Sequence, residues 1–191
     1  MSRFFHKCII ITAPSGAGKT SITRHLINTF PELAFSVSAS TREPRSNEKE
    51  GQDYYFIAVE TFKEKIQKKE FIEWEMVYEG RYYGTLKQEL ERLWAIDKLP
   101  ILDIDVQGAI HVQQRYPATT ISIFIQPPSI DELKKRLEGR GSETASSLEA
   151  RVNKAAYELS FHHYFENVIV NDNFDRACSE AESIVREFID K

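Results

Sequence analysis

A glycine-rich stretch near the start of the chain has the residue types that bind a phosphate. Residues 13–20 read Ala-Pro-Ser-Gly-Ala-Gly-Lys-Thr and follow the apolar run of residues 8–12. Glycines let successive backbone N–H groups point at an anion, a lysine reaches the β- and γ-phosphates, and a threonine hydroxyl can hold Mg²⁺. A helical pattern begins directly afterwards, and its positive end adds to the field. The stretch predicts a phosphate-binding loop for a nucleoside triphosphate, although Ala13 stands where the strict pattern has glycine.

Two arginines form a candidate site for a second phosphate group. Arg42 and Arg45 flank Pro44 in residues 40–53, a charged loop with almost no apolar content. A guanidinium presents two parallel N–H groups that match a phosphate. A run of charges is also commonly a solvated surface, so this stretch alone leaves both interpretations open.

Residues 100–105 form an apolar run that we predict to be a strand, and two acids lie at its end. In a protein with a phosphate-binding loop, the acid at the tip of a neighbouring strand orders Mg²⁺, usually through water. We expect Asp103 to serve the metal together with Thr20. Asp105 lies one step further out, where it could meet a second substrate or cap the next helix.

Three arginines flank a polar hinge at residues 139–144, namely Arg136, Arg140 and Arg151. Phosphoryl transfer builds negative charge on the migrating group, and arginines carried by a closing segment can neutralise it. Ordinary arginines on a helix surface are an equal alternative at this point.

A pair of glutamates alternates around Trp74 in the predicted strand at residues 71–78. Glu73 and Glu75 therefore share one face of that strand, and one of them could be buried beside a ligand. Neighbouring glutamates on one strand are more often exposed to solvent.

The elements that carry these residues alternate between strands and helices. We predict strands at 7–12, 35–39, 54–59, 71–78, 100–105, 120–125 and 168–170, and a turn at 80–85. We predict helices at 19–30, 61–69, 86–96, 108–115, 129–137, 148–164 and 174–189. Apolar strands between helices favour an α/β fold with a parallel sheet covered on both faces.

Composition limits the functional classes. The chain has 191 residues, 41% of them hydrophobic, and a net charge of −4. This favours one globular unit with insertions and argues against a broad nucleic-acid-binding surface. Cys8 and Cys178 lack the spacing of a metal site. We also expect no leader peptide, no membrane span and a cytoplasmic location.

The chain resembles the guanylate kinases over nearly its whole length. The motifs that carry this resemblance lie at residues 13–20, 35–45, 48–54, 71–74, 82–85, 102–108, 127–129, 136–141 and 170–172. Each is short, but their joint order is specific. The resemblance implies ATP + GMP ⇌ ADP + GDP with Mg²⁺ in purine nucleotide metabolism. It also implies a core (1–34, 86–126 and 165–191), a GMP-binding insertion (35–85), and a lid with flanking helices (127–164).

The same resemblance implies roles for individual residues. ATP would be bound by the loop and the 170–172 segment through Ser15, Gly16, Ala17, Gly18, Lys19, Thr20, Ser21, Asn171 and Asp172. GMP would be bound by Ser38, Arg42, Arg45, Tyr54, Glu73, Tyr83, Thr85, Asp103 and Asp105. The transferred group would be stabilised by Lys19, Arg45, Arg136, Arg140 and Arg151. Ala13, Thr20 and Asn173 depart from the family's commonest residues, and none of them is assigned to the transfer step.

Two alternative functions are a non-catalytic binding domain and a kinase for another nucleoside monophosphate. Scaffold domains that resemble guanylate kinases bind phosphopeptides, but they typically lose the loop lysine, which is present here as Lys19. Another nucleoside monophosphate kinase is disfavoured because Glu73 can accept from both donors of guanine's edge, while Ser38 and Thr85 can donate to its O6. The sequence leaves the oligomeric state and the use of dGMP open.

Overall fold

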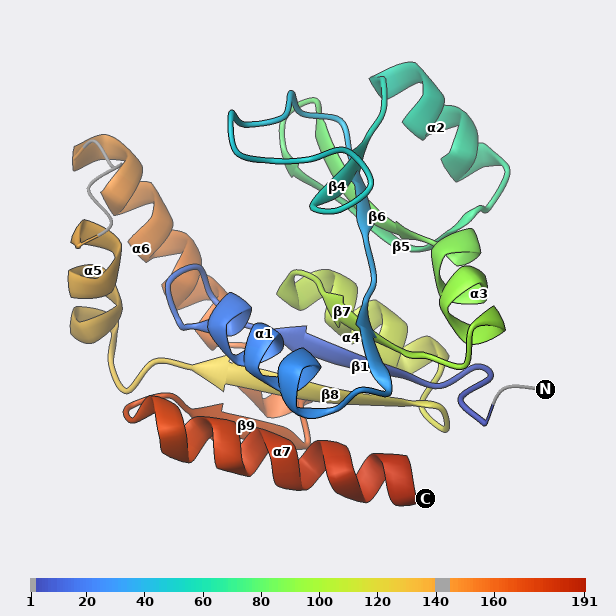
Figure 1. Cartoon of the computed structure of the whole chain (residues 1–191). Coiled ribbons are helices and arrows are strands. Elements are labelled where there is room, and N and C mark those ends of the chain that lie inside the picture. Colours follow the sequence, from blue (N-terminus) through green and yellow to red (C-terminus); the bar gives the residue numbers. More distant parts are fainter. Residues whose placement is uncertain (1–2, 140–144) are drawn as a thin grey trace.

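The computed structural model describes residues 3–139 and 145–191, which form two sheets with helices packed around them (Figure 1). The larger sheet has five parallel strands in the order β2-β7-β1-β8-β9. They are β1 (Cys8–Thr12), β2 (Leu33–Phe35), β7 (Leu99–Asp103), β8 (Thr120–Gln126) and β9 (Asn167–Val170). The smaller sheet has the order β4-β3-β6-β5. Its strands are β3 (Ser38–Ser40), β4 (Tyr54–Phe56), β5 (Phe71–Tyr78) and β6 (Arg81–Leu86).

Helices cover both faces of the larger sheet: α1 (Lys19–Thr29), α3 (Lys87–Ala95) and α7 (Phe174–Asp190) on one face, and α4 (Val106–Arg115) on the other. Helix α2 (Val59–Gln67) connects β4 to β5 and packs on the smaller sheet. Helices α5 (Ile130–Glu138) and α6 (Ala145–Leu159) lie between β8 and β9 in the chain. The predicted α/β class with a parallel sheet is confirmed. The predicted helices are found within a few residues of their expected limits, except that α6 ends at Leu159 and a separate 3₁₀ turn, His162–Tyr164, follows it.

Alternation along β1 explains how the sheet is covered. Ile9 and Ile11 belong to the cluster that packs against α1, α3 and α7, whereas Cys8 and Ile10 belong to the cluster on the α4 side. Because successive side chains of a strand point to opposite faces, a continuous apolar run needs helices on both sides. Figure 1 shows α1 and α7 on one face of the sheet and α4 on the other.

The single strand predicted for residues 35–39 is wrong. The chain instead completes β2 at Phe35, crosses from one sheet to the other through Ser36 and Val37, and begins β3 at Ser38. The Ser36 N–H still bonds to the carbonyl of Ile101 in the larger sheet, while Ala39 already pairs with Gly84 in the smaller one. Strands this short have too few residues for an alternating pattern to reveal a change of sheet.

Three other predicted boundaries also differ. The strand predicted for 54–59 ends at Phe56, and α2 begins at Val59. Gly84, expected in a turn, lies inside β6, where it pairs with Trp74 of the antiparallel strand β5. Asp105, expected at a strand end, is the N-cap of α4, and its Oδ1 accepts a hydrogen bond from the Gly108 N–H at 2.8 Å.

A helical pair packs beside the phosphate-binding loop. Leu133 and Leu137 of α5 pack with Ala155 of α6 in a small buried cluster. The same two leucines approach Gly16 so closely that a Cβ there would lie 3.0 Å from Leu137. Ser129 caps α5 by accepting from the Glu132 N–H. No helix within residues 3–139 and 145–191 is long and apolar enough to cross a membrane.

Gly84 should be intolerant of any side chain. A Cβ at this position would lie 2.8 Å from both the Glu73 carbonyl oxygen and Trp74 Cβ. We expect Gly84→Ala to lower the free energy of unfolding by about 1–3 kcal/mol, measured by urea denaturation. The control is Gly139→Ala, whose nearest contact would be 3.4 Å, and which should be close to neutral. Equal stability of the two variants would contradict this strand packing.

Candidate functional site

The phosphate-binding loop adopts a conformation that requires glycine at two positions. Gly16 and Gly18 have φ angles of 94° and 103°, in the left-handed region. A Cβ at Gly18 would overlap the side-chain amide of Asn171, whose Nδ2 donates to the Ala17 carbonyl at 2.8 Å. Asn171 therefore braces the loop from the end of β9. Ala13 is buried at the start of the loop.

Lys19 lies at the junction of the loop and the neighbouring strand. Its ammonium group forms an ion pair with Asp103 and donates to the Ile104 carbonyl at 3.2 Å. Burial opposes the charge of Lys19, but the Asp103 carboxylate outweighs burial and raises the lysine pKa. Lys19 is therefore a fixed positive charge at the end of β1 and β7.

Arg42 is held rigidly on the side of the smaller sheet. Its guanidinium donates two hydrogen bonds of 2.6 Å to Glu48 and one of 3.2 Å to the Tyr83 hydroxyl, and it lies 5.0 Å from the Tyr54 ring centre. The hydrogen bonds from Arg42 lower the pKa of Glu48 to about 2, and Glu48 raises the pKa of Arg42. Glu48 also accepts from the Arg45 N–H at 2.8 Å, which fixes the turn that carries both arginines.

Glu73 is a buried acid at the other end of the same surface. It is 7% exposed, and its Oε1 accepts from the Thr85 hydroxyl at 2.7 Å. Burial raises the pKa of Glu73 to about 7, the Thr85 hydrogen bond opposes this shift, and the Asp105 charge adds to it. A Cβ at Gly108 would lie 2.7 Å from Glu73 Oε2, so α4 leaves room for this carboxyl.

Glu75 and His111 join the smaller sheet to α4 next to Glu73. His111 Nδ1 lies 3.2 Å from Glu75 Oε1. Burial and the Asp105 charge raise the pKa of Glu75, and His111 acts in the opposite direction. The predicted shared face of Glu73 and Glu75 is confirmed, because both line one cleft.

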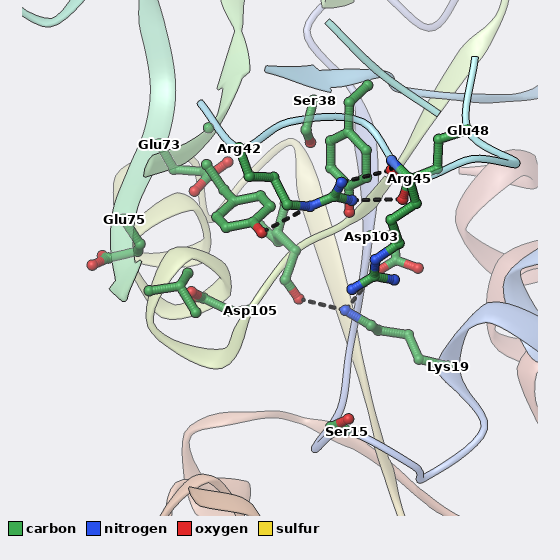
Figure 2. Close-up of a pocket in the computed structure, with 15 residues that line it drawn as sticks. Ser15, Lys19, Ser38, Arg42, Arg45, Glu48, Glu73, Glu75, Asp103 and Asp105 are labelled. Carbon is green, nitrogen blue, oxygen red and sulfur yellow. Dashed lines mark hydrogen bonds and ion pairs between the residues drawn. The ribbon is translucent and has the colours of Figure 1, made fainter. Parts of the chain in front are cut away.

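Two clefts meet beside Lys19, Arg45 and Asp103. The first, here called the sheet cleft, has a volume of about 340 Å³ and lies beneath the smaller sheet. Its lining includes Ser38, Arg42, Glu48, Glu73, Glu75 and Tyr83. The second, the loop cleft, has a volume of about 420 Å³ and is lined by the phosphate-binding loop and α6. Both clefts share Ser15, Lys19, Arg45, Tyr54, Asp103 and Asp105. Figure 2 shows Arg45 reaching from its loop toward Lys19 where the clefts join.

Several residues expected in the site have other positions or other roles. Arg136 donates to the Asn171 backbone carbonyl at 3.0 Å, and it lines neither cleft. Asp172 pairs with Arg176 on the surface at 2.5 Å. The Thr85 hydroxyl faces Glu73 rather than the sheet cleft. Arg140 lies outside the described residues.

The loop cleft also contains residues that the sequence analysis missed. Lys154 and Glu158 line it beside Arg151, all on α6. The spacing of these three residues, with steps of three and four, places them on one helix face, and this was the signal available in the sequence. Glu48 was part of a recognised motif but was given no role.

Comparisons with known proteins relate the chain to one family. The guanylate kinase family model matches residues 5–188. The guanylate kinase of Bacteroides fragilis is 44% identical over 183 residues, which cover 96% of this chain and 90% of that protein. The guanylate kinase of Geobacter metallireducens is 46% identical over 178 residues, covering 92% and 86%. The crystal structure of guanylate kinase from Anaplasma phagocytophilum superimposes with a TM-score of 0.78 at 30% identity, covering 97% of this chain and 87% of that one.

The raised pKa of Glu73 predicts a pH-dependent loss of stability. Well below pH 4.5, the ordinary pKa of this carboxyl, the group is protonated in both the folded and the unfolded state. As the pH rises toward 7, the carboxyl ionises in the unfolded state first, so the folded state loses stability until about pH 7. Glutamine is neutral throughout. We expect the unfolding free energy of Glu73→Gln, relative to the unmodified protein, to rise by on the order of 2 kcal/mol between about pH 5 and pH 8.

Urea unfolding at several pH values measures this difference. The matched control is Glu79→Gln, which removes an exposed carboxylate from the turn after β5 and should show no comparable trend. A difference between Glu73→Gln and the unmodified protein that stayed constant over this range would mean that Glu73 ionises as freely in the folded state as in the unfolded one.

Proposed function

This chain belongs to the guanylate kinase family, and we propose that its two joined clefts hold ATP and GMP for the transfer ATP + GMP = ADP + GDP. The observation that carries this assignment is the shared wall of the clefts, at which Lys19, Arg45 and Asp103 meet. Two nucleotides bound on either side of that wall would place their phosphates at the same point. The proposal includes a cytoplasmic location, a role in purine nucleotide metabolism, and dGMP as a further candidate acceptor.

The loop cleft is the proposed ATP site. Backbone N–H groups of residues 15–20 would surround the β- and γ-phosphates, and the N-terminal end of α1 would add positive potential. The left-handed glycines at Gly16 and Gly18 support this role, because they give the loop its curvature. Arg151 and Lys154 would contribute further positive charge from α6.

The sheet cleft is the proposed GMP site. Arg45 and Tyr54 line both clefts, and Arg42 lies beside the Tyr54 ring and donates to the Tyr83 hydroxyl; this group suits the GMP phosphate. Glu73 lies at the other end, and its ionised carboxylate could accept from both N1–H and the 2-amino group of guanine. Adenine lacks that pair of donors, so a buried carboxylate would stay unpaired.

Mg²⁺ fits the residues at the wall of the loop cleft. Thr20 offers a hydroxyl and Asp103 a carboxylate, both hard oxygen ligands, and both line this cleft. Mg²⁺ bound there would neutralise charge on the transferring phosphates. Thr20 and Asp103 would hold it, Asp103 through water.

The transfer itself needs positioning and charge balance. A GMP phosphate oxygen attacks the γ-phosphorus while the bond to the ADP oxygen breaks in line, and no enzyme-bound intermediate forms. Lys19, Arg45 and Arg151 lie where charge would build, and we assign the same role to Arg136 and Arg140 on closure of the lid. This assignment uses the division into core, insertion (35–85) and lid (127–164).

Removal of the loop lysine tests the assignment of the ATP site. We expect Lys19→Ala to lower kcat by roughly 10²–10³-fold or more, because a cation aimed at the developing charge is lost. GMP affinity should change little, because the main GMP contacts come from the smaller sheet. A coupled assay of ADP formation and calorimetry with GMP measure the two quantities. Lys63→Ala on the exposed face of α2 is the control, and turnover of Lys19→Ala within tenfold of this control would refute the assignment.

Replacement of the buried acid tests base recognition. Glutamine can accept only one of the two guanine hydrogen bonds, so Glu73→Gln should lower kcat/KM for GMP but not for AMP. The GMP-to-AMP ratio should narrow by roughly 10²-fold or more. The exposed Glu79→Gln variant should keep the ratio of the unmodified protein. If Glu73→Gln also kept it, Glu73 would have no part in reading the base.

A further inference from the structure

The chain passes between the two sheets at two points that lie on the same side of the molecule (Figure 1). It leaves the larger sheet through Ser36 and Val37, between β2 and β3. It returns where β6 ends at Leu86 and α3 begins at Lys87. The position of the smaller sheet on the larger one therefore depends on how these two crossings are held together.

One carboxylate connects both crossings. Glu89 lies in the first turn of α3, just after the second crossing, and is 3% exposed. Its Oε1 accepts from the Val37 N–H of the first crossing at 3.2 Å. Its Oε2 accepts from the Tyr55 hydroxyl of β4 at 3.0 Å. Glu89, which belongs to α3, thus forms hydrogen bonds with both the first crossing and the smaller sheet.

Arg92 completes this network and balances its charge. It donates to Glu89 through Nε at 2.9 Å and through a terminal nitrogen at 2.8 Å. The Arg92 side chain is 51% exposed, whereas that of Glu89 is 2% exposed, so the pair has one buried and one solvated end. A buried carboxylate with four donors has its acceptor sites filled, and the loss of any donor leaves a costly unpaired group.

We propose that Glu89 is a positioning residue for the acceptor nucleotide. It lines neither the sheet cleft nor the loop cleft, and it acts through the neighbours of its partners. Val37 precedes Ser38, and Tyr55 follows Tyr54; Ser38 and Tyr54 both line the sheet cleft. The inference rests on the proposed function, which puts the acceptor GMP in the sheet cleft and the donor ATP in the loop cleft.

The network controls a distance to which phosphoryl transfer is sensitive. Residues of the smaller sheet and its loop hold the acceptor, whereas the phosphate-binding loop after β1 holds the donor. Displacement of reacting atoms by about 1 Å can cost roughly 10²-fold in rate. Glu89 bonds to the acceptor side and to α3, and no hydrogen bond or ion pair within the described residues joins it to residues 13–20.

The test compares Glu89→Gln with Glu91→Gln. The control makes the same substitution two positions along α3, at an exposed residue outside both clefts. Steady-state kinetics give kcat and the separate KM values for GMP and ATP, calorimetry gives the Kd for GMP alone, and thermal unfolding reports folding. We expect Glu89→Gln to raise the KM and Kd for GMP about tenfold and to lower kcat. The KM for ATP should stay within about twofold, and Glu91→Gln should match the unmodified protein.

Tyr55→Phe provides a second test, and it decides the matter if Glu89→Gln does not fold. It removes a single donor to Glu89 and should raise the KM for GMP about threefold, with the KM for ATP unchanged. The positioning role would be overturned if the KM values for GMP and ATP changed equally. It would also be overturned if Glu89→Gln had the same kinetic constants as Glu91→Gln. An unchanged KM for GMP in Tyr55→Phe would overturn it as well. If the unmodified protein did not phosphorylate GMP, the proposed function would fail as well. If it did phosphorylate GMP and the variants had unchanged kinetic constants, only the positioning role would be overturned.

Discussion

The parallel direction of the strands in the larger sheet is the constraint on which the site depends. Because parallel strands end at the same edge, whatever follows them is brought together there. The phosphate-binding loop follows β1, Asp103 ends β7, and Asn171 follows β9. The Lys19–Asp103 ion pair and the Asn171–Ala17 hydrogen bond are direct results of this arrangement. In a sheet of mixed direction, the residues that follow the reversed strands would lie at the opposite edge.

The smaller sheet supplies a second, complementary half of the site. Several polar groups of the smaller sheet and its loop are already hydrogen-bonded to one another: Arg42 donates to Glu48, and Thr85 donates to Glu73. Such pairing fixes side chains before a ligand arrives, so less conformational entropy is lost on binding. The two ends differ in electrostatic character. The arginines of the sheet cleft lie toward the junction with the loop cleft, where Asp103 and Glu48 accompany them, whereas the end at Glu73 and Glu75 has acids and no arginine in its lining.

Local patterns in the sequence predict part of this structure. The β1–loop–α1 unit is predictable because its apolar run, glycines and helical period lie within about twenty consecutive residues. The change of sheet at Ser36–Val37 is not, since it depends on pairing with Ile101 and Gly84 far along the chain. Gly84 resembles a turn residue, yet the need for glycine comes from Trp74 on another strand.

Charged residues on helices show the same limit. Glu89 has the sequence setting of an ordinary solvated helix residue, and only the tertiary fold reveals its partners on two other segments. Lys154 and Glu158 are likewise indistinguishable from surface charges until α6 is placed beside the phosphate-binding loop. Helical spacing shows which residues share a face, but it does not show what that face meets.

The ion pair between Lys19 and Asp103 would couple the binding of the proposed donor to that of a divalent cation. While the two groups face each other, the wall of the clefts is locally electroneutral. A polyphosphate that drew Lys19 to itself would leave Asp103 uncompensated, and a divalent cation beside Asp103 would restore the charge balance. By thermodynamic reciprocity, each of these two ligands would then raise the affinity for the other. Each ligand alone would bind more weakly than in the presence of the other.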